Sequence, residues 1–187
     1  HRRAVKALAI SDSFFLTRGL LKLANRRAEL SSDRFGLSFP NPIGIAAGMD
    51  KDAQAVRGWA NLGFGFIEIG GVTMDPQEGN PKPRMFRVKK LQALVNRMGL
   101  NNIGSLKIAR KLAKVKTNGK WPNVPVAANI GKSINTANDD AATDYSKTLE
   151  RLWPYVDLFI INVSSPNTPG VHELQEELAL TAVLKAC

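Results

Sequence analysis

One repeated pattern constrains the fold of this chain most strongly. In it, a short apolar run is followed by a turn of small or polar residues and then by an amphipathic segment. The apolar runs predict strands at residues 43–47, 64–69, 124–130 and 156–161. Helices are expected over residues 52–62, 137–152 and 174–187, with a further polar helix and its following loop over residues 107–120. Strands that alternate with helices form a parallel sheet with right-handed crossovers. The sequence therefore predicts an α/β fold.

Three segments depart from this repeat. Residues 1 to about 30 read as helical, with a break at Ser11-Asp12-Ser13, and residues 35–39 read as one short strand. Residues 74–104 are rich in Pro, Gly and Asn, with an expected hairpin at 85–88 and 93–96. Because a long insertion between regular elements usually serves a function, residues 74–104 are a candidate functional segment.

Composition excludes several kinds of site. The 187 residues suffice for one domain of ordinary size. They include one cysteine, Cys187, and two histidines, His1 and His172, so neither a disulfide within the chain nor a cysteine-rich or multi-histidine metal site is available. We expect no metal. No apolar run approaches the length of a membrane span.

The net charge of +10 can attract nucleic acid, an anionic membrane surface or small anions, or can simply belong to a solvated surface. Basic residues alternate with apolar ones between Arg2 and Arg27. This pattern fits a helix on a membrane surface and fits equally two ordinary helices packed on the domain.

Small or polar residues follow each expected strand. The fourth strand ends in Asn162, followed by Ser164, Ser165 and Asn167, with prolines at 166 and 169. Carboxamides can bind a planar heterocycle through donors and acceptors, and a serine on a rigid loop can be held against a substrate proton. The same residue types also form ordinary capped turns, and both interpretations of this segment stay open.

The other strand ends strengthen the functional interpretation. Ala46-Ala47-Gly48 would allow a flat ligand to approach the backbone, and Lys51 supplies a cation. Asn96, Asn129 and Asn162 bring carboxamides from three segments. Together these residues suit a planar polar cofactor and a small anionic substrate.

Two familiar nucleotide motifs are not met. Gly63-Phe64-Gly65 follows a helix and precedes a strand, which is the reverse of the dinucleotide fingerprint. Gly131-Lys132-Ser133 resembles the end of a P-loop, but Val126 stands where the first glycine is required.

At these residues the chain resembles the quinone-dependent class 2 of the dihydroorotate dehydrogenase family. The resemblance extends through essentially the whole chain. The matching stretches are Asn41 to Lys51, Gly63 to Thr73, Pro76 to Arg84, Asn96 to Gly99, Asn129 to Lys132 and Asn162 to Gly170.

The resemblance implies the first half of a (β/α)8 barrel, about four βα units, that binds FMN at the carboxyl ends of its strands. It implies oxidation of dihydroorotate to orotate in pyrimidine (UMP) biosynthesis, with Ser165 as the general base that removes the C5 proton. It places substrate contacts at Lys51, Asn96, Arg97, Met98, Gly99, Leu100, Asn162, Asn167 and Thr168. It places flavin contacts at Ala46, Ala47, Gly48, Lys51, Gly71, Thr73, Asn129 and Asn162.

The same resemblance makes residues 1–32 a helical quinone-tunnel and membrane-associating segment, and residues 33–187 an incomplete FMN-binding barrel domain. His1, Ala4 and Arg87 match tunnel positions. A membrane quinone is the implied electron acceptor. The implied location is peripheral, on the cytoplasmic face of a bacterial inner membrane or on the mitochondrial inner membrane, and no nucleic-acid partner is implied.

Two departures from the family pattern stand out. Leu100 occupies a position where the family usually has Phe, so we expect looser packing against substrate there. The family enzyme is also nearly twice as long, and its first tunnel helix and second half-barrel have no counterpart here. Four strands cannot close a barrel, so we expect this segment alone to be unstable and inactive.

Two other functions remain as alternatives. A dihydrouridine synthase-like enzyme would also be an FMN barrel and would use basic charge to bind tRNA, but it needs a cysteine near the flavin. A non-catalytic half-barrel would bind no flavin and would not depend on Ser165.

Overall fold

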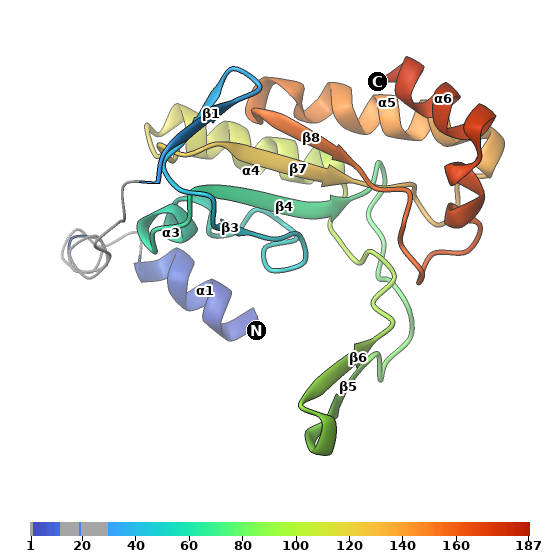
Figure 1. Ribbon diagram of the computed structural model, residues 1–187, viewed down its shortest axis with the longest axis horizontal. Coiled ribbons are helices and arrows are strands. Elements are labelled where there is room, and N and C mark those ends of the chain that lie inside the picture. The colour runs from blue at the N-terminus through green and yellow to red at the C-terminus, as the bar shows by residue number, and fades with distance from the viewer. Residues whose placement is uncertain (1, 12–18, 20–29) are drawn as a thin grey trace.

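The computed structural model describes residues 2–11, 19 and 30–187 and has a parallel sheet at its centre. The sheet contains β3 (Gly44–Ile45), β4 (Phe66–Val72), β7 (Val126–Ile130) and β8 (Leu158–Ile161), in the order β3-β4-β7-β8. Every neighbouring pair is parallel. The strand arrows therefore point the same way, toward the side from which a long hairpin hangs (Figure 1).

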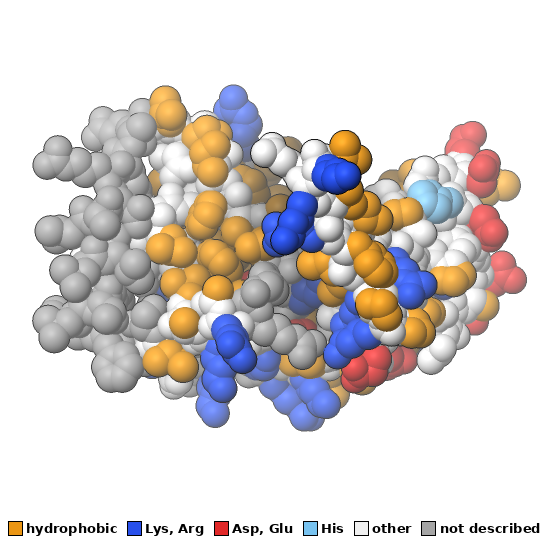
Figure 2. Space-filling model, turned by 90° about the horizontal axis from the view of Figure 1, so that it is seen from below, with side chains coloured by type: hydrophobic (Ala, Val, Ile, Leu, Met, Phe, Trp, Pro, Cys, Tyr) orange, Lys and Arg blue, Asp and Glu red, His pale blue; other side chains and the backbone are white. Residues whose placement is uncertain are grey.

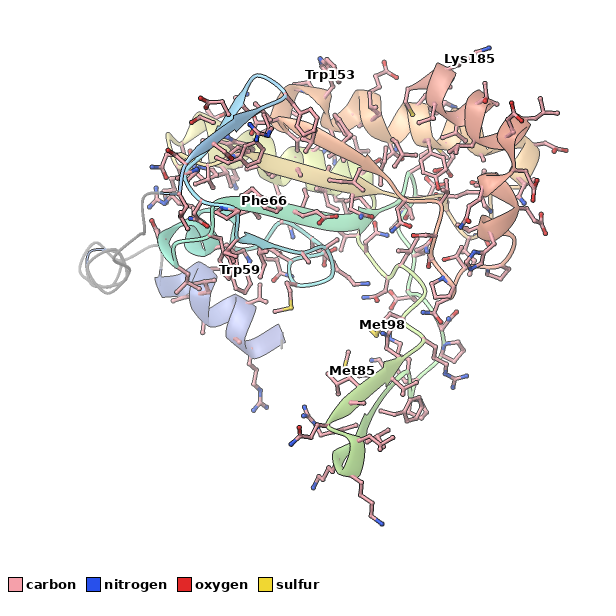
Figure 3. The ribbon with its side chains drawn as sticks, in the orientation of Figure 1. Trp59, Phe66, Met85, Met98, Trp153 and Lys185 are labelled. Atoms are coloured by element: carbon pink, nitrogen blue, oxygen red, sulfur yellow. The ribbon has the colours of Figure 1, made fainter. Side chains whose placement is uncertain are left out.

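Helices cover one face of this sheet. They are α3 (Val56–Asn61), α4 (Ser105–Thr117), α5 (Ala141–Leu152) and α6 (Glu177–Ala186), with short 3-10 turns at Asn138–Asp140, Trp153–Tyr155 and Val171–Gln175. Trp153 and Lys185 mark this helical layer, on the opposite side of the molecule from the hairpin residue Met85 (Figure 3).

The core lies between the sheet and its helices because alternate strand residues point that way. Ile67 and Ile69 of β4 are fully buried, and so are Val126, Ala128 and Ile130 of β7. They belong to one apolar cluster with residues of α4 and α5, namely Ile108, Leu112, Tyr145 and Leu152. The intervening strand positions face the other side of the sheet.

The predicted hairpin in the long insertion is confirmed. Strands β5 (Met85–Val88) and β6 (Ala93–Asn96) pair antiparallel around a 3-10 turn at Lys89–Leu91. This hairpin projects from the body, and Met98 lies where it rejoins (Figures 1 and 3). Its large apolar side chains are exposed, as at Met85 (57%), Leu91 (76%) and Leu94 (57%). Figure 2 shows orange and blue side chains side by side on the face from which the hairpin projects.

The strand predicted at 35–39 is confirmed only over Leu37–Phe39. Its first two residues are not part of a strand, because Phe35 and Gly36 both have positive φ (56° and 73°) and make a tight turn. That turn joins β1 (Ser32–Arg34) to β2 (Leu37–Phe39) in an antiparallel pair. Two successive residues with positive φ are typical of the turn that matches the twist of a two-residue hairpin.

The helix predicted at 52–62 begins later, at Val56. The cause is Asp50, whose carboxylate accepts hydrogen bonds from the backbone N–H groups of Gln54 (2.7 Å) and Ala55 (2.8 Å) and holds the preceding residues in a turn. Asp50 is only 1% exposed. Burial raises the pKa of its carboxyl, and the two N–H donors act in the opposite direction.

The N-terminal helix α1 (Arg2–Ser11) packs on the domain. Val5 is 3% exposed and belongs to the core cluster. Leu8 lies so close to Gly58 of α3 that a Cβ there would come within 2.7 Å of the Leu8 Cγ. Packing on the domain, one of the two interpretations of the basic N-terminus, is therefore observed for α1, while residues 12–18 and 20–29 lie outside the described residues. Among the described residues, no helix is long and apolar enough to cross a membrane.

Truncation of a buried leucine should reveal how much the core stabilises the fold. Leu152 is fully buried at the end of α5, whereas Leu178 in α6 is 86% exposed. We expect Leu152→Ala to lower the free energy of unfolding by about 2–5 kcal/mol, because it removes apolar contact and leaves a cavity. Leu178→Ala should change it by less than about 0.5 kcal/mol. Urea unfolding of the intact protein with each substitution measures both values, and equal effects would contradict this placement of the core.

Tyr145 should give the protein a distinct alkaline titration. Its hydroxyl donates a 2.7 Å hydrogen bond to the carbonyl oxygen of Asn162, and burial raises its pKa to about 12. Because the folded-state pKa lies above the unfolded value of about 10, the resulting stability is complete below pH 10 and is lost as the pH rises through about 12.

Absorption of tyrosinate at about 295 nm measures this titration. In Tyr145→Phe the component near pH 12 should disappear, whereas Tyr155→Phe should retain it. A high-pH component that survives Tyr145→Phe would show that Tyr145 is not its source.

Candidate active site

The candidate site lies where the parallel strands end, because their carboxyl ends meet at one edge of the sheet. Gly71 is within β4, Asn129 is within β7, and Asn162 directly follows β8. In register, Gly70 faces Asn129, and Asn129 faces Ile160. The sheet thus brings together three positions that are far apart in the sequence.

A chain of hydrogen bonds links the polar side chains at this edge. Asn129 Nδ2 donates to Glu68 Oε1 at 2.8 Å, and Asn162 Nδ2 donates to Asn129 Oδ1 at 3.0 Å. Asn162 Oδ1 in turn accepts from the backbone N–H of Ser164 at 3.1 Å and from its hydroxyl at 3.3 Å. The two predicted flavin-contacting asparagines are therefore neighbours.

The loop after β8 holds Ser165 beside a second hydroxyl. Ser165 is half-buried, and its Oγ lies 3.2 Å from Thr168 Oγ1, which is only 3% exposed as a residue. The carbonyl oxygen of Asn167 accepts a 3.2 Å hydrogen bond from Asn80 Nδ2 of the long insertion. The serine loop is thereby tied to the segment that carries the other predicted substrate contacts.

The turn after β3 supplies a small-residue surface and a cation. The N–H of Gly48 donates to the carbonyl oxygen of Gly70 at 2.7 Å, so this turn lies against the end of β4. Ala46 is exposed and Ala47 half-buried. A Cβ added at Gly48 would meet nothing within 4 Å, so the space beside its Cα is open.

Lys51 projects from the same turn. Its Nζ donates a 3.2 Å hydrogen bond to Asn101 Oδ1. Burial lowers the pKa of Lys51, the nearby Arg84 lowers it further, and Asp52 opposes both. An anionic ligand beside this ammonium would stabilise its charged form.

The predicted substrate segment at 96–100 crosses the strand ends. Leu100, at φ 48°, covers two glycines, since a Cβ at Gly71 would lie 2.8 Å from its Cδ2 and one at Gly131 would lie 2.9 Å from its Cδ1. Only glycine at these positions leaves room for this contact. Leu100 therefore lies directly over the ends of β4 and β7.

The rest of this segment is fixed by backbone contacts. The carbonyl oxygen of Gly99 accepts from Gln77 Nε2 at 3.1 Å. Asn96 is exposed, and its Oδ1 accepts from the N–H of Met98 at 3.3 Å. The Arg97 guanidinium donates to the carbonyl oxygen of Pro83 through Nε and Nη2 and so braces the base of the hairpin.

Thr73 has a different environment from the other predicted contacts. It is fully buried, its hydroxyl donates to the carbonyl oxygen of Asp75 at 2.6 Å, and it accepts from Asn102 Nδ2 at 2.8 Å. Both roles of the hydroxyl are thus occupied within the protein.

Among the described residues, no hydrogen bond joins Ala4 or Arg87 to this cluster. Ala4 is exposed on α1, and Arg87 is exposed on β5. His1 lies outside the described residues.

Sequence reasoning missed several residues that organise the site. Glu68 accepts from Asn129, Asn101 binds Lys51, and Asn102 donates to Thr73 and, at 2.7 Å, to the carbonyl oxygen of Leu100. A signal for Glu68 was available, because it is the one charged residue in an otherwise apolar or glycine-containing strand. For the two asparagines no such signal existed, since their partners come from distant turns.

Comparisons with known proteins agree with the expected family. The dihydroorotate dehydrogenase family model matches residues 29–187. The chain is 46% identical over its whole length to a dihydroorotate dehydrogenase (quinone) of Chloroflexus aurantiacus, of which it covers 51%. It is 51% identical, over 84% of its length, to the enzyme of that name from Thermus thermophilus, of which it covers 44%.

Solved structures agree as well. The crystal structure of DHODH from Eimeria tenella in complex with ferulenol matches with a TM-score of 0.78 and 40% identity, over 84% of this chain and 42% of that one. The ligand-free form matches with the same TM-score over 95% of this chain and 51% of that one. The predicted fold, the first half of a (β/α)8 barrel, is confirmed.

The chain spans about half the length of the curated relatives it matches. The family model nevertheless covers most of the chain, and the relatives are similar to it along nearly all of its length. The chain therefore belongs to the dihydroorotate dehydrogenase family.

Proposed function

We propose that this chain supplies the general base that deprotonates the substrate, together with one wall of the flavin site, in a quinone-dependent dihydroorotate dehydrogenase. The observation that carries the proposal is the hydrogen-bonded polar edge that runs from Asn129 through Asn162 to the serine loop. This edge lies at the carboxyl ends of parallel strands, where enzymes with this architecture place their catalytic residues.

The residues present fit FMN. Ala46, Ala47 and Gly48 offer a surface with little side-chain bulk, and the space beside Gly48 is open. Carboxamides such as those of Asn129 and Asn162 match a ring system that carries both donors and acceptors. Held by these residues, FMN would supply the hydride-accepting and electron-transferring chemistry of the reaction.

Ser165 is the residue we assign to proton removal from C5 of dihydroorotate. A serine hydroxyl is a weak base at its ordinary pKa, so it needs a partner that takes its own proton. Thr168 Oγ1, at 3.2 Å, can donate to or accept from Ser165 Oγ and thereby hold the hydroxyl in one orientation. The proton that Ser165 releases then passes to water, either directly or through the Thr168 hydroxyl, which gives up its own proton as it accepts this one.

Lys51 and the 96–100 segment are assigned to substrate binding. The Lys51 ammonium suits the carboxylate of dihydroorotate, because a charge-assisted hydrogen bond is stronger in a partly buried site than in water. Leu100 is assigned to the apolar side of the substrate site, and its position over Gly71 and Gly131 supports this assignment.

The hairpin is assigned to the route between flavin and quinone. In its register Met85 faces Asn96 and Arg87 faces Leu94, and all four side chains lie on one face. The predicted tunnel residue Arg87 thus shares a face with the predicted substrate residue Asn96. We assign the remaining tunnel wall to residues 1–32 and propose that this segment and the hairpin associate with the surface of the membrane that holds the quinone.

Neither alternative function gains support from the site. A dihydrouridine synthase-like enzyme needs a cysteine beside the flavin, but Cys187 is exposed at the end of α6, away from the strand ends. A non-catalytic half-barrel gives no reason for the hydrogen bond between Asn129 and Asn162 at the strand ends, or for a lysine and two hydroxyls in the adjoining turn and loop.

Replacement of the proposed base separates chemistry from binding. In the intact enzyme, Ser165→Ala should retain bound flavin but slow dihydroorotate oxidation by on the order of 10²-fold or more, the scale of general-base catalysis. Stopped-flow absorption of the flavin after mixing with dihydroorotate measures that step. Ser146→Ala, on the outer helix α5, should leave the rate unchanged. Normal flavin reduction in Ser165→Ala would remove Ser165 from this role.

A further inference from the structure

Glu68 accepts a hydrogen bond at one end of the series of side chains that runs through Asn129 and Asn162 toward the loop that carries Ser165. It lies within β4, on the face opposite the buried Ile67 and Ile69. An ionised carboxylate can only accept hydrogen bonds, so it selects the Nδ2 end of the Asn129 carboxamide. The Oδ1 end must then point away from Glu68.

The next step follows from the orientation of Asn129. Its Oδ1 accepts from Asn162 Nδ2, which leaves Asn162 Oδ1 to accept from Ser164. A reversed Asn129 would place its oxygen against the carboxylate and its NH2 against another NH2. The observed orientations of the two carboxamides therefore give a hydrogen-bond partner to both ends of this series, the Glu68 carboxylate at one end and the backbone N–H of Ser164 at the other.

We infer that Glu68 is a positioning residue, which anchors the Asn129 carboxamide and through it fixes Asn162 and the start of the serine loop. The inference rests on the proposed function for its catalytic consequence, but the anchoring itself does not. Hydrogen bonds to a charged group are about twice as strong as neutral ones, so this end of the chain is its firmest point.

Two substitutions separate an anchoring role from a purely electrostatic one. Glu68→Met keeps a side chain of similar length but removes the acceptor, so Asn129 loses its anchor. Glu68→Gln removes the charge but retains a carbonyl oxygen that can accept from Asn129 Nδ2. Glu150→Met makes the same change at an exposed position of α5 and serves as the control.

The first readout needs neither flavin nor turnover. In the intact protein with selectively ¹⁵N-labelled asparagine, the side-chain NH2 signals of residues 129 and 162 are assigned from Asn129→Ser and Asn162→Ser spectra. We expect Glu68→Met to accelerate hydrogen exchange of both NH2 groups by about ten-fold or more, although residue 68 bonds only the first. Glu68→Gln and Glu150→Met should leave both protected.

The second readout is catalytic. Glu68→Met should lower kcat for dihydroorotate oxidation by about ten- to a hundred-fold, the scale for loss of a hydrogen bond to a charged group, and Glu68→Gln should recover most of it. Exchange that changes at Asn129 alone, or at neither residue, would overturn the inference. So would a Glu68→Gln variant as impaired as Glu68→Met, since that result assigns the effect to charge. If the wild-type protein fails to oxidise dihydroorotate, the proposed function falls, and the exchange data still decide the role of Glu68.

Discussion

Parallel pairing of β3, β4, β7 and β8 is the constraint on which the rest of the structure depends. It forces every strand to end at the same edge, so residues as distant in sequence as Gly48, Asn129 and Asn162 come together. It also divides the strand side chains between two faces. One face buries Ile67, Ile69 and their partners against the helices, and the other is free to carry Glu68 and Asn129. Core and site are thus built from alternate residues of the same strands.

The long insertion, residues 74–104, covers the ends of the strands. Asn102 joins it to the end of β4, because its carboxamide donates to Thr73 Oγ1 and to the carbonyl oxygen of Leu100 and accepts from the N–H of Gly104 at 2.8 Å. An antiparallel bridge between Gln77 and Asn102 closes the base of the insertion. These contacts hold Leu100 over Gly71 and Gly131 while the hairpin beyond Met98 extends away from the body. The base of the segment therefore lies over the strand ends, while the tip of its hairpin lies away from them (Figure 1).

The sequence predicts the arrangement of elements well and the details of turns poorly. The pattern of the long insertion located both hairpin strands. Apolar periodicity located all four sheet strands, because burial on a parallel sheet demands runs such as Val126–Ile130. It failed at Phe35, whose aromatic side chain suggested a strand although its positive φ places it in a turn. It also began α3 too early, because the N–H groups of Gln54 and Ala55 bond the Asp50 carboxylate. Polar residues at strand ends indicated the site. The hydrogen bonds among them depend on the register of neighbouring strands, which a local sequence pattern does not predict.

We propose that this polar edge belongs to a site that binds flavin and oxidises dihydroorotate. The visible absorption of the flavin in the purified intact protein, recorded after anaerobic addition of dihydroorotate, tests both parts of this proposal. We predict a yellow protein whose absorption bleaches as the flavin is reduced, and recovers when a quinone is added. A yellow protein that dihydroorotate does not bleach would contradict the proposed substrate, and a protein that binds no flavin at all would contradict the assignment of this edge as a flavin site.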